Sequence, residues 1–176
     1  TGVLEIYKKR IPWLLLLMVS ATFTGMIISS FEDALAAQVV LTAFIPMLMD
    51  TGGNSGSQAS VTVIRGLSLH EIEFSDLPKV IWKESRIAVL CGVTLALTNF
   101  VKLLFFDKVT ITVASVVCIT LVATVFFAKI VGCTLPMLAK KVGFDPAVMA
   151  SPFITTIVDA LSLIIYFQIA TRLLHF

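Results

Sequence analysis

Five long runs of apolar residues restrict what this chain can fold into. They span residues 11–31, 34–66, 85–106, 110–140 and 147–172. A bilayer core needs about 20 mostly apolar residues per helix, and lipid offers no partners for free backbone groups, so each run predicts a membrane-spanning helix. The predicted fold is therefore all-α: a polytopic membrane protein with five transmembrane helices in a lipid bilayer.

The composition excludes the main soluble classes. Hydrophobic residues make up 58% of the chain and charged residues 14%, and the mean hydropathy is +1.01, whereas soluble domains are about half apolar and about a quarter charged. The net charge of +2 is too small and too scattered to indicate a nucleic-acid partner. Cys91, Cys118 and Cys133 lie in apolar stretches without a CxxC pair, which indicates neither disulfides nor a zinc site.

The basic residues between the runs predict an orientation. With the N-terminus inside, the inner segments hold nine cations, namely Lys8, Lys9, Arg10, Arg65, Lys79, Lys83, Arg86, Lys140 and Lys141, and the outer segments hold Lys102, Lys108 and Arg172. Cytoplasmic segments carry the excess of Lys and Arg, so we expect a cytoplasmic N-terminus and an outer C-terminus in the cell membrane. Lys129 lies inside the fourth run, where we expect it to snorkel or to pair with an acid.

One longer connection, residues 67–84, is predicted to be a cytoplasmic interfacial segment. Ser75 and Asp76 would cap a short amphipathic helix with Pro78 in its first turn, and Trp82 is available for the membrane interface.

A polar, glycine-rich tract interrupts the second run at residues 46–58. At helical spacing one face carries Asp50, Asn54, Ser57, Gln58 and Val61, while Gly53, Gly56 and Ser60 thin an adjoining face so that another helix can approach. Pro46 and the glycines would permit a bend in the middle of this helix. The tract predicts either a polar pathway through the membrane or a tight helix crossing with hydrogen bonds between helices.

The fifth run carries a second polar stripe. Ala147, Ser151, Thr155 and Asp159 follow one another at intervals of four, and Ser162 and Tyr166 continue the face. A carboxylate near the bilayer centre costs at least about 2.5 kcal/mol, so Asp159 must face a cavity, a cation or a polar partner such as Lys129. Asp145 and Pro146 precede the run and are either a helix cap or part of the inner mouth of a pathway.

The chemistry of these stripes favours a hard cation. Carboxylate, carboxamide and hydroxyl oxygens suit Mg²⁺ and do not rank it above Ca²⁺, Mn²⁺ or Co²⁺. Softer transition metals prefer Cys and clustered His, which the two polar stripes lack. Because Mg²⁺ usually keeps most of its waters, one or two carboxylates with neutral oxygens are enough to hold it.

The chain resembles the membrane domain of the MgtE family of magnesium channels. The resemblance covers essentially the whole chain and is carried by residues 46–60, by Arg65-Gly66, by Gly143-Phe144-Asp145-Pro146-Ala147 and by residues 155–160. It implies a homodimer with five helices per subunit and a pore lined by the second and fifth helices. It also implies that Asp159 is the central Mg²⁺ site, with Thr155, Asn54 and Ser57 as further pore positions. The family often has Asn at the position of Ser57, and many members lack an acid at Asp50.

The family's cytoplasmic N domain and CBS pair, which sense magnesium, are not in this sequence. By the resemblance, residues 1–10 are the end of a cytoplasmic connecting helix and residues 11–176 are the ion-conducting domain.

The predicted function is transport of divalent cations, by a channel rather than an enzyme, with Asp50, Asn54, Ser57, Asp145, Ser151, Thr155 and Asp159 as the candidate metal-binding residues. A cation-coupled carrier with alternating access is the alternative within transport. An intramembrane aspartyl protease using Asp50 and Asp159 is the enzymatic alternative, although no glycine-x-glycine precedes Asp159. A purely structural membrane subunit would leave the two aligned stripes unexplained.

Overall fold

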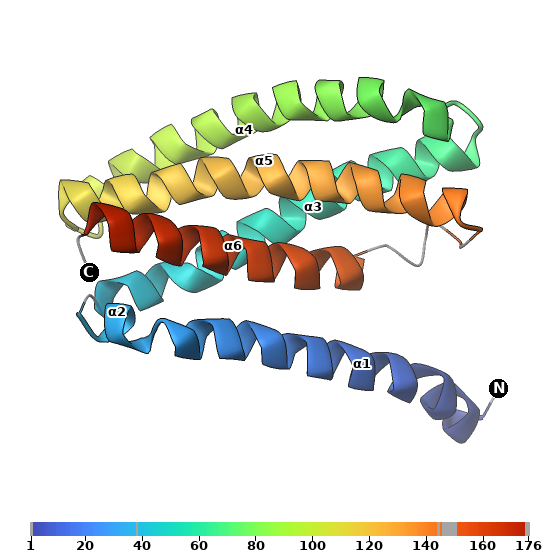
Figure 1. Ribbon diagram of the computed structural model, residues 1–176, viewed down its shortest axis with the longest axis horizontal. Helices are drawn as coiled ribbons and strands as arrows, with labels where there is room; N and C mark the ends of the chain where they lie inside the picture. The colour runs from blue at the N-terminus through green and yellow to red at the C-terminus, as the bar shows by residue number, and fades with distance from the viewer. Residues whose placement is uncertain (1, 38, 144, 146–150, 175–176) are drawn as a thin grey trace.

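The computed structural model describes residues 2–37, 39–143, 145 and 151–174, and every regular element within them is helical. In chain order the elements are α1 (Val3–Ser30), α2 (Glu32–Ala37), the 3₁₀ helix η1 (Val39–Phe44), α3 (Ile45–Ser68), the 3₁₀ turn η2 (Phe74–Asp76), α4 (Leu77–Phe105), α5 (Ile111–Lys141) and α6 (Ser151–Leu173). The helices α1, α4, α5 and α6 run roughly along one direction, and α3 crosses behind α5 and α6 at an angle (Figure 1). The predicted all-α fold is confirmed.

Four of these helical segments are long and apolar enough to cross a membrane: Val3–Ser30, Phe74–Phe105, Ile111–Lys141 and Phe153–Leu173. They correspond to the first, third, fourth and fifth apolar runs. The helix of the second run, α3, has 24 residues, which is long enough, but its polar tract leaves it outside this group. The hydropathy of α3 alone therefore does not predict that it spans the membrane, and whether it does so depends on the helices that surround it.

The prediction of one continuous helix over residues 34–66 is wrong. This run breaks into α2, η1 and α3, and Pro46 stands in the first turn of α3. Proline has no N–H to donate and its ring clashes with the carbonyl four residues earlier, so an α-helix cannot pass through Pro46 undisturbed and begins beside it instead. Pro46 therefore starts the polar helix and does not bend its middle.

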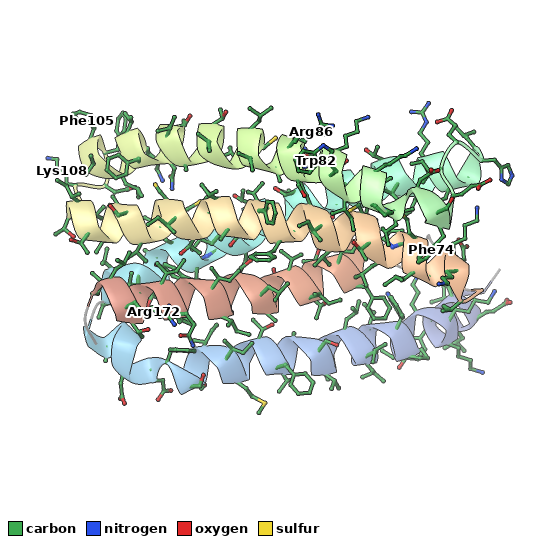
Figure 2. The ribbon with its side chains drawn as sticks, turned by 45° about the horizontal axis from the view of Figure 1, so that its top comes forward. Phe74, Trp82, Arg86, Phe105, Lys108 and Arg172 are labelled. Carbon is green, nitrogen blue, oxygen red and sulfur yellow. The ribbon has the colours of Figure 1, made fainter. Side chains whose placement is uncertain are left out.

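The separate short helix expected within residues 67–84 is also wrong, because α4 runs without a break from Leu77 to Phe105. Pro78 does lie in its first turn, as predicted. The Asp76 carboxylate accepts a hydrogen bond from the Glu73 N–H at 3.0 Å and closes the turn η2 instead of capping α4. Trp82 is exposed and lies under the Arg86 guanidinium, 5.5 Å from the ring centre (Figure 2).

The helix α5 forms the middle of the bundle and packs against α3, α4 and α6. The helix α1 runs along α6, with Trp13 against the edge of Phe153 at 5.0 Å, and it has no buried residue. An apolar helix without a buried side suits contact with lipid.

At the end of the bundle that holds Arg172 and Lys108 (Figure 2), aromatic contacts fix α6 in place. The Tyr166 hydroxyl donates to the Leu41 carbonyl at 2.7 Å, and the rings of Phe31 and Phe167 stack at 4.8 Å. Tyr166 is fully buried, and Ser162 is buried with its hydroxyl on the Val158 carbonyl. These two residues therefore do not extend the polar stripe of α6 into a pathway.

The glycines of α3 do permit a close helix crossing, at Gly56 as expected and at Gly52 instead of Gly53. A Cβ on Gly56 would lie 2.7 Å from Ile154, and one on Gly52 would lie 2.6 Å from Thr124. A Cβ on Gly132 of α5 would collide with the Gly56 carbonyl. Gly53 has ordinary contacts at 3.5 Å with Thr155, so Gly52, Gly56 and Gly132 make the crossing tight and Gly53 does not.

Candidate cation-binding cavity

A cavity of about 350 Å³ lies between α3 and α6. Its lining residues are Ile45, Pro46, Met49, Asp50, Gly53, Asn54, Ser57, Thr155 and Asp159. Five of the seven candidate metal-binding residues, two of them acids, thus come together from helices that are far apart in the sequence.

The α3 side of the cavity follows from helical periodicity. Asp50, Asn54 and Ser57 recur at intervals of four and three, so they share one face. In the single chain Asp50 and Asn54 are exposed, whereas Gly52 and Gly56 are buried against the neighbouring helices. The small residues hold α3 in the bundle, and this directs its oxygen-bearing face into the cavity.

The α6 side contributes Thr155 and Asp159, one turn apart and both half-buried. The Thr155 side chain touches Gly53, which brings this part of α6 close to the α3 backbone. Asp50 lies near enough to Asp159 for the two negative charges to interact. Two carboxylates that repel each other across a small polar cavity form a region of negative potential that attracts a cation.

The oxygen atoms of the cavity suit a hydrated Mg²⁺ better than a bare metal ion. Its donors are two carboxylates, one carboxamide and two hydroxyls, and no three or more His, Cys, Asp or Glu of the described residues come together as a metal cage. Six waters around Mg²⁺ occupy about 180 Å³ at about 30 Å³ each. A cavity of about 350 Å³ has room for this hydrated ion.

Two candidate residues are not among the lining residues. Asp145 is exposed between α5 and α6. The Ser151 side chain and residues 146–150 lie outside the described residues, so the choice between a helix cap and an inner mouth at Asp145-Pro146 stays open. The roles predicted for Asp145 and Ser151 remain predictions.

Lys129 lies inside a helix, as predicted, but its predicted partner is wrong, and Glu84 was missed. Lys129 is 3% exposed and does not snorkel, and its amine donates to the Gln58 carboxamide oxygen at 3.4 Å instead of pairing with Asp159. Glu84 was assigned to a connection, but it is buried in α4. A signal was present, since Glu84, Ala88, Gly92 and Ala96 recur every four residues and form the packed face of α4.

Comparisons with known proteins show which family the chain is similar to. A family model described as MgtE, divalent cation transporter, matches residues 45–169. The chain is 34% identical over 174 residues to the magnesium transporter MgtE of Thermus thermophilus, covering 99% of this chain and 38% of that protein. It is 38% identical over 175 residues to the magnesium transporter MgtE of Bacillus subtilis, covering 95% and 37%. The corresponding protein of Enterococcus faecalis is 30% identical over 173 residues, covering 98% and 38%. The chain spans less than two fifths of the length of these relatives.

Proposed function

Since the chain belongs to the MgtE family of divalent cation transporters, we propose that it carries hydrated Mg²⁺ across the cell membrane through a pore lined by α3 and α6. The observation that carries the proposal is the cavity that Asp50 and Asp159 line together with Asn54, Ser57 and Thr155. Asp159 is the principal cation site, and Asp50, which is exposed in the single chain, adds negative charge to the same cavity.

We propose that α3 is the fifth spanning helix. Its polar face needs water or protein around it, because lipid cannot satisfy Asp50 and Asn54. Its apolar and glycine residues pack on α5 and α6. The basic residues that flank the spans favour a cytoplasmic N-terminus and an outer C-terminus in the cell membrane. The cytoplasmic sensor domains of the family would then lie before α1, on the cytoplasmic side.

A channel fits this cavity better than a carrier does. A hydrated ion that is held through its waters makes weak, exchangeable contacts, which permit rapid passage. A carrier would instead close around its ion and couple it to a second one. The cavity also contains the acid pair behind the protease hypothesis, but the family and the named relatives are transporters, so we do not propose proteolysis.

Uptake into liposomes tests the function. Purified protein in liposomes loaded with a Mg²⁺-sensitive dye should admit Mg²⁺ far faster than protein-free liposomes. Flux through a channel should rise with an imposed inside-negative potential and need no second ion gradient. Adding Ca²⁺, Mn²⁺ or Co²⁺ outside as competitors would rank these cations. If uptake equals that of protein-free liposomes at every potential, the proposed function is wrong.

We further propose a two-fold homodimer. The α3 face that carries Asp50, Asn54, Gln58 and Val61 is exposed in the single chain, and a membrane protein needs a second surface to enclose such a face with water. A second copy related by a two-fold axis would cover it and bring two Asp159 carboxylates to one pore.

Cross-linking should trap this dimer through Val61. In a variant whose three native cysteines are alanine, Val61→Cys should give dimers with a short bismaleimide, because this side chain would lie near the partner's copy of α3. Leu97→Cys on α4 is the matched control, since both side chains are 65% exposed, and it should stay monomeric. A protein that transports Mg²⁺ while neither position cross-links would contradict a pore shared between two chains.

A further inference from the structure

A larger cavity of about 850 Å³ opens between α3, α4 and α5 and contains two buried charges. It is lined by Asn54, Ser57, Gln58, Ala59, Val61, Thr62, Lys83, Glu84, Ile87 and Lys129. Lys129 is 3% exposed and Glu84 is 7% exposed. Charged side chains that are buried in a membrane protein need a counter-charge or a function.

The partners present do not neutralise these charges. The Lys129 ammonium donates one long hydrogen bond, 3.4 Å, to the uncharged Gln58 side chain. Within the described residues, no ion pair joins Lys129 or Glu84 to another side chain, and no hydrogen bond is made by the Glu84 carboxylate. Lys129 and Glu84 thus line one cavity. The ammonium can donate further hydrogen bonds there, and the carboxylate can accept them.

The helix register puts the two charges at the same depth. The Cys118 thiol donates to the Ala96 carbonyl, and Gly92 packs on Val122. Continued along these antiparallel helices, this register sets residue 84 opposite residue 130, next to Lys129. Both charges lie beside the part of α3 that carries Gln58. Gln58 is about two helical turns from Asp50 along α3.

The charged cavity adjoins the Asp159 cavity, because Asn54 and Ser57 line both. Lys129 also lines a third cavity of about 470 Å³ together with Asn54 and Gln58. A cation that leaves Asp159 along α3 would therefore next meet Glu84 and Lys129.

We propose that Glu84 is a second binding group for a divalent cation and that Lys129 is its built-in competitor. This inference rests on the proposed function for the path of the ion, but not for the binding itself. In the absence of metal the Lys129 ammonium balances the Glu84 charge across the water of the cavity. A hydrated divalent cation competes with it for Glu84 and Gln58, so the lysine keeps binding weak enough for the ion to leave.

The test is equilibrium binding of Mn²⁺ in nanodiscs, followed by electron paramagnetic resonance, because Mn²⁺ favours the same oxygen ligands as Mg²⁺. Lys129→Met should tighten one Mn²⁺ site by about tenfold or more, since it removes a positive charge beside the carboxylate. Glu84→Gln should remove that site, and the double variant should show no gain. Lys83→Met is the matched control, because Lys83 lines the same cavity but is exposed, and it should change affinity less than about twofold.

Several outcomes would overturn the second site. These are an unchanged affinity in Lys129→Met, a gain that survives in the double variant with Glu84→Gln, or an equal gain in Lys83→Met. Lys129→Gln is a second way to remove the charge if Lys129→Met does not give a monodisperse protein. Mg²⁺ flux is measured separately. Absent flux with the expected binding pattern would refute only the proposed transport, while normal flux without that pattern would refute only the second site.

Discussion

Asp159→Asn should weaken Mg²⁺ binding by roughly 100-fold and lower Mg²⁺ flux accordingly, while the bundle stays folded. The substitution keeps the shape of the side chain and removes one negative charge in each subunit. At a separation of about 5 Å, one carboxylate attracts a divalent ion by about 7 kcal/mol at an effective dielectric constant of about 20 and by about 2 kcal/mol in water. A loss of about 3 kcal/mol lies between these limits and corresponds to a factor of roughly 100 in affinity. Calorimetric titration with Mg²⁺ and dye-based flux in liposomes measure the two effects at matched protein levels.

Folding and affinity should separate in this variant. A half-buried carboxylate close to Asp50 costs free energy in a membrane protein, so Asp159→Asn should leave the melting temperature unchanged or raise it. Asp33→Asn removes the same charge from an exposed position on α2 and should leave binding and flux as they are. Wild-type affinity and flux in Asp159→Asn would refute the central site and turn attention to Asp50 and Glu84.

The polar faces of α3 and α6 could be predicted from the sequence because each depends on spacing within one helix. Asp50, Asn54 and Ser57 recur at helical intervals, as do Thr155 and Asp159, and lipid excludes oxygen-rich faces. The sequence therefore indicates that these faces are enclosed, and the structure places them around one cavity.

The burial of Glu84 and the partner of Lys129 were not predicted from the sequence, because they depend on where neighbouring helices start and how they pack. Glu84 stands one residue before the apolar run that begins at residue 85, so a hydropathy window assigns it to a connection, although α4 starts about two turns earlier, at Leu77, and buries it. The position of Lys129 could be predicted, but its partner could not, because Gln58 is 71 residues away in the chain. Proline favours a helix start at Pro46, but proline alone does not predict the break there, because α1 and α5 continue through Pro12 and Pro136.

The helix α3 serves two opposite demands, and this explains why glycines alternate with oxygen-bearing side chains in it. One face must present Asp50, Asn54 and Ser57 to water, and the other must come close enough to α5 and α6 to be held without long apolar side chains. Between membrane helices, close packing of small residues replaces the hydrophobic effect as the source of association. The Gly56–Gly132 contact should therefore be among the most sensitive points of the fold.

Gly132→Ala should destabilise the bundle by about 2 to 3 kcal/mol and abolish Mg²⁺ flux. The added Cβ would collide with the Gly56 carbonyl, and a backbone atom cannot rotate away as a flexible side chain can, so α3 and α5 must separate. That separation would also displace Asn54 and Ser57 from the cavity. Thermal unfolding in detergent and flux in liposomes measure the two losses.

Gly25→Ala on α1 is the matched control for this substitution, because a Cβ at Gly25 would meet nothing within 4 Å. Alanine favours a helix over glycine by about 1 kcal/mol, so this variant should be as stable as the wild type or more stable, with normal flux. The same gain in helix propensity acts in Gly132→Ala, and the steric clash must exceed it before any loss is seen. A melting temperature for Gly132→Ala that equals that of Gly25→Ala would show that α3 and α5 do not cross as closely as the structure places them, and the glycines of α3 would then need another explanation.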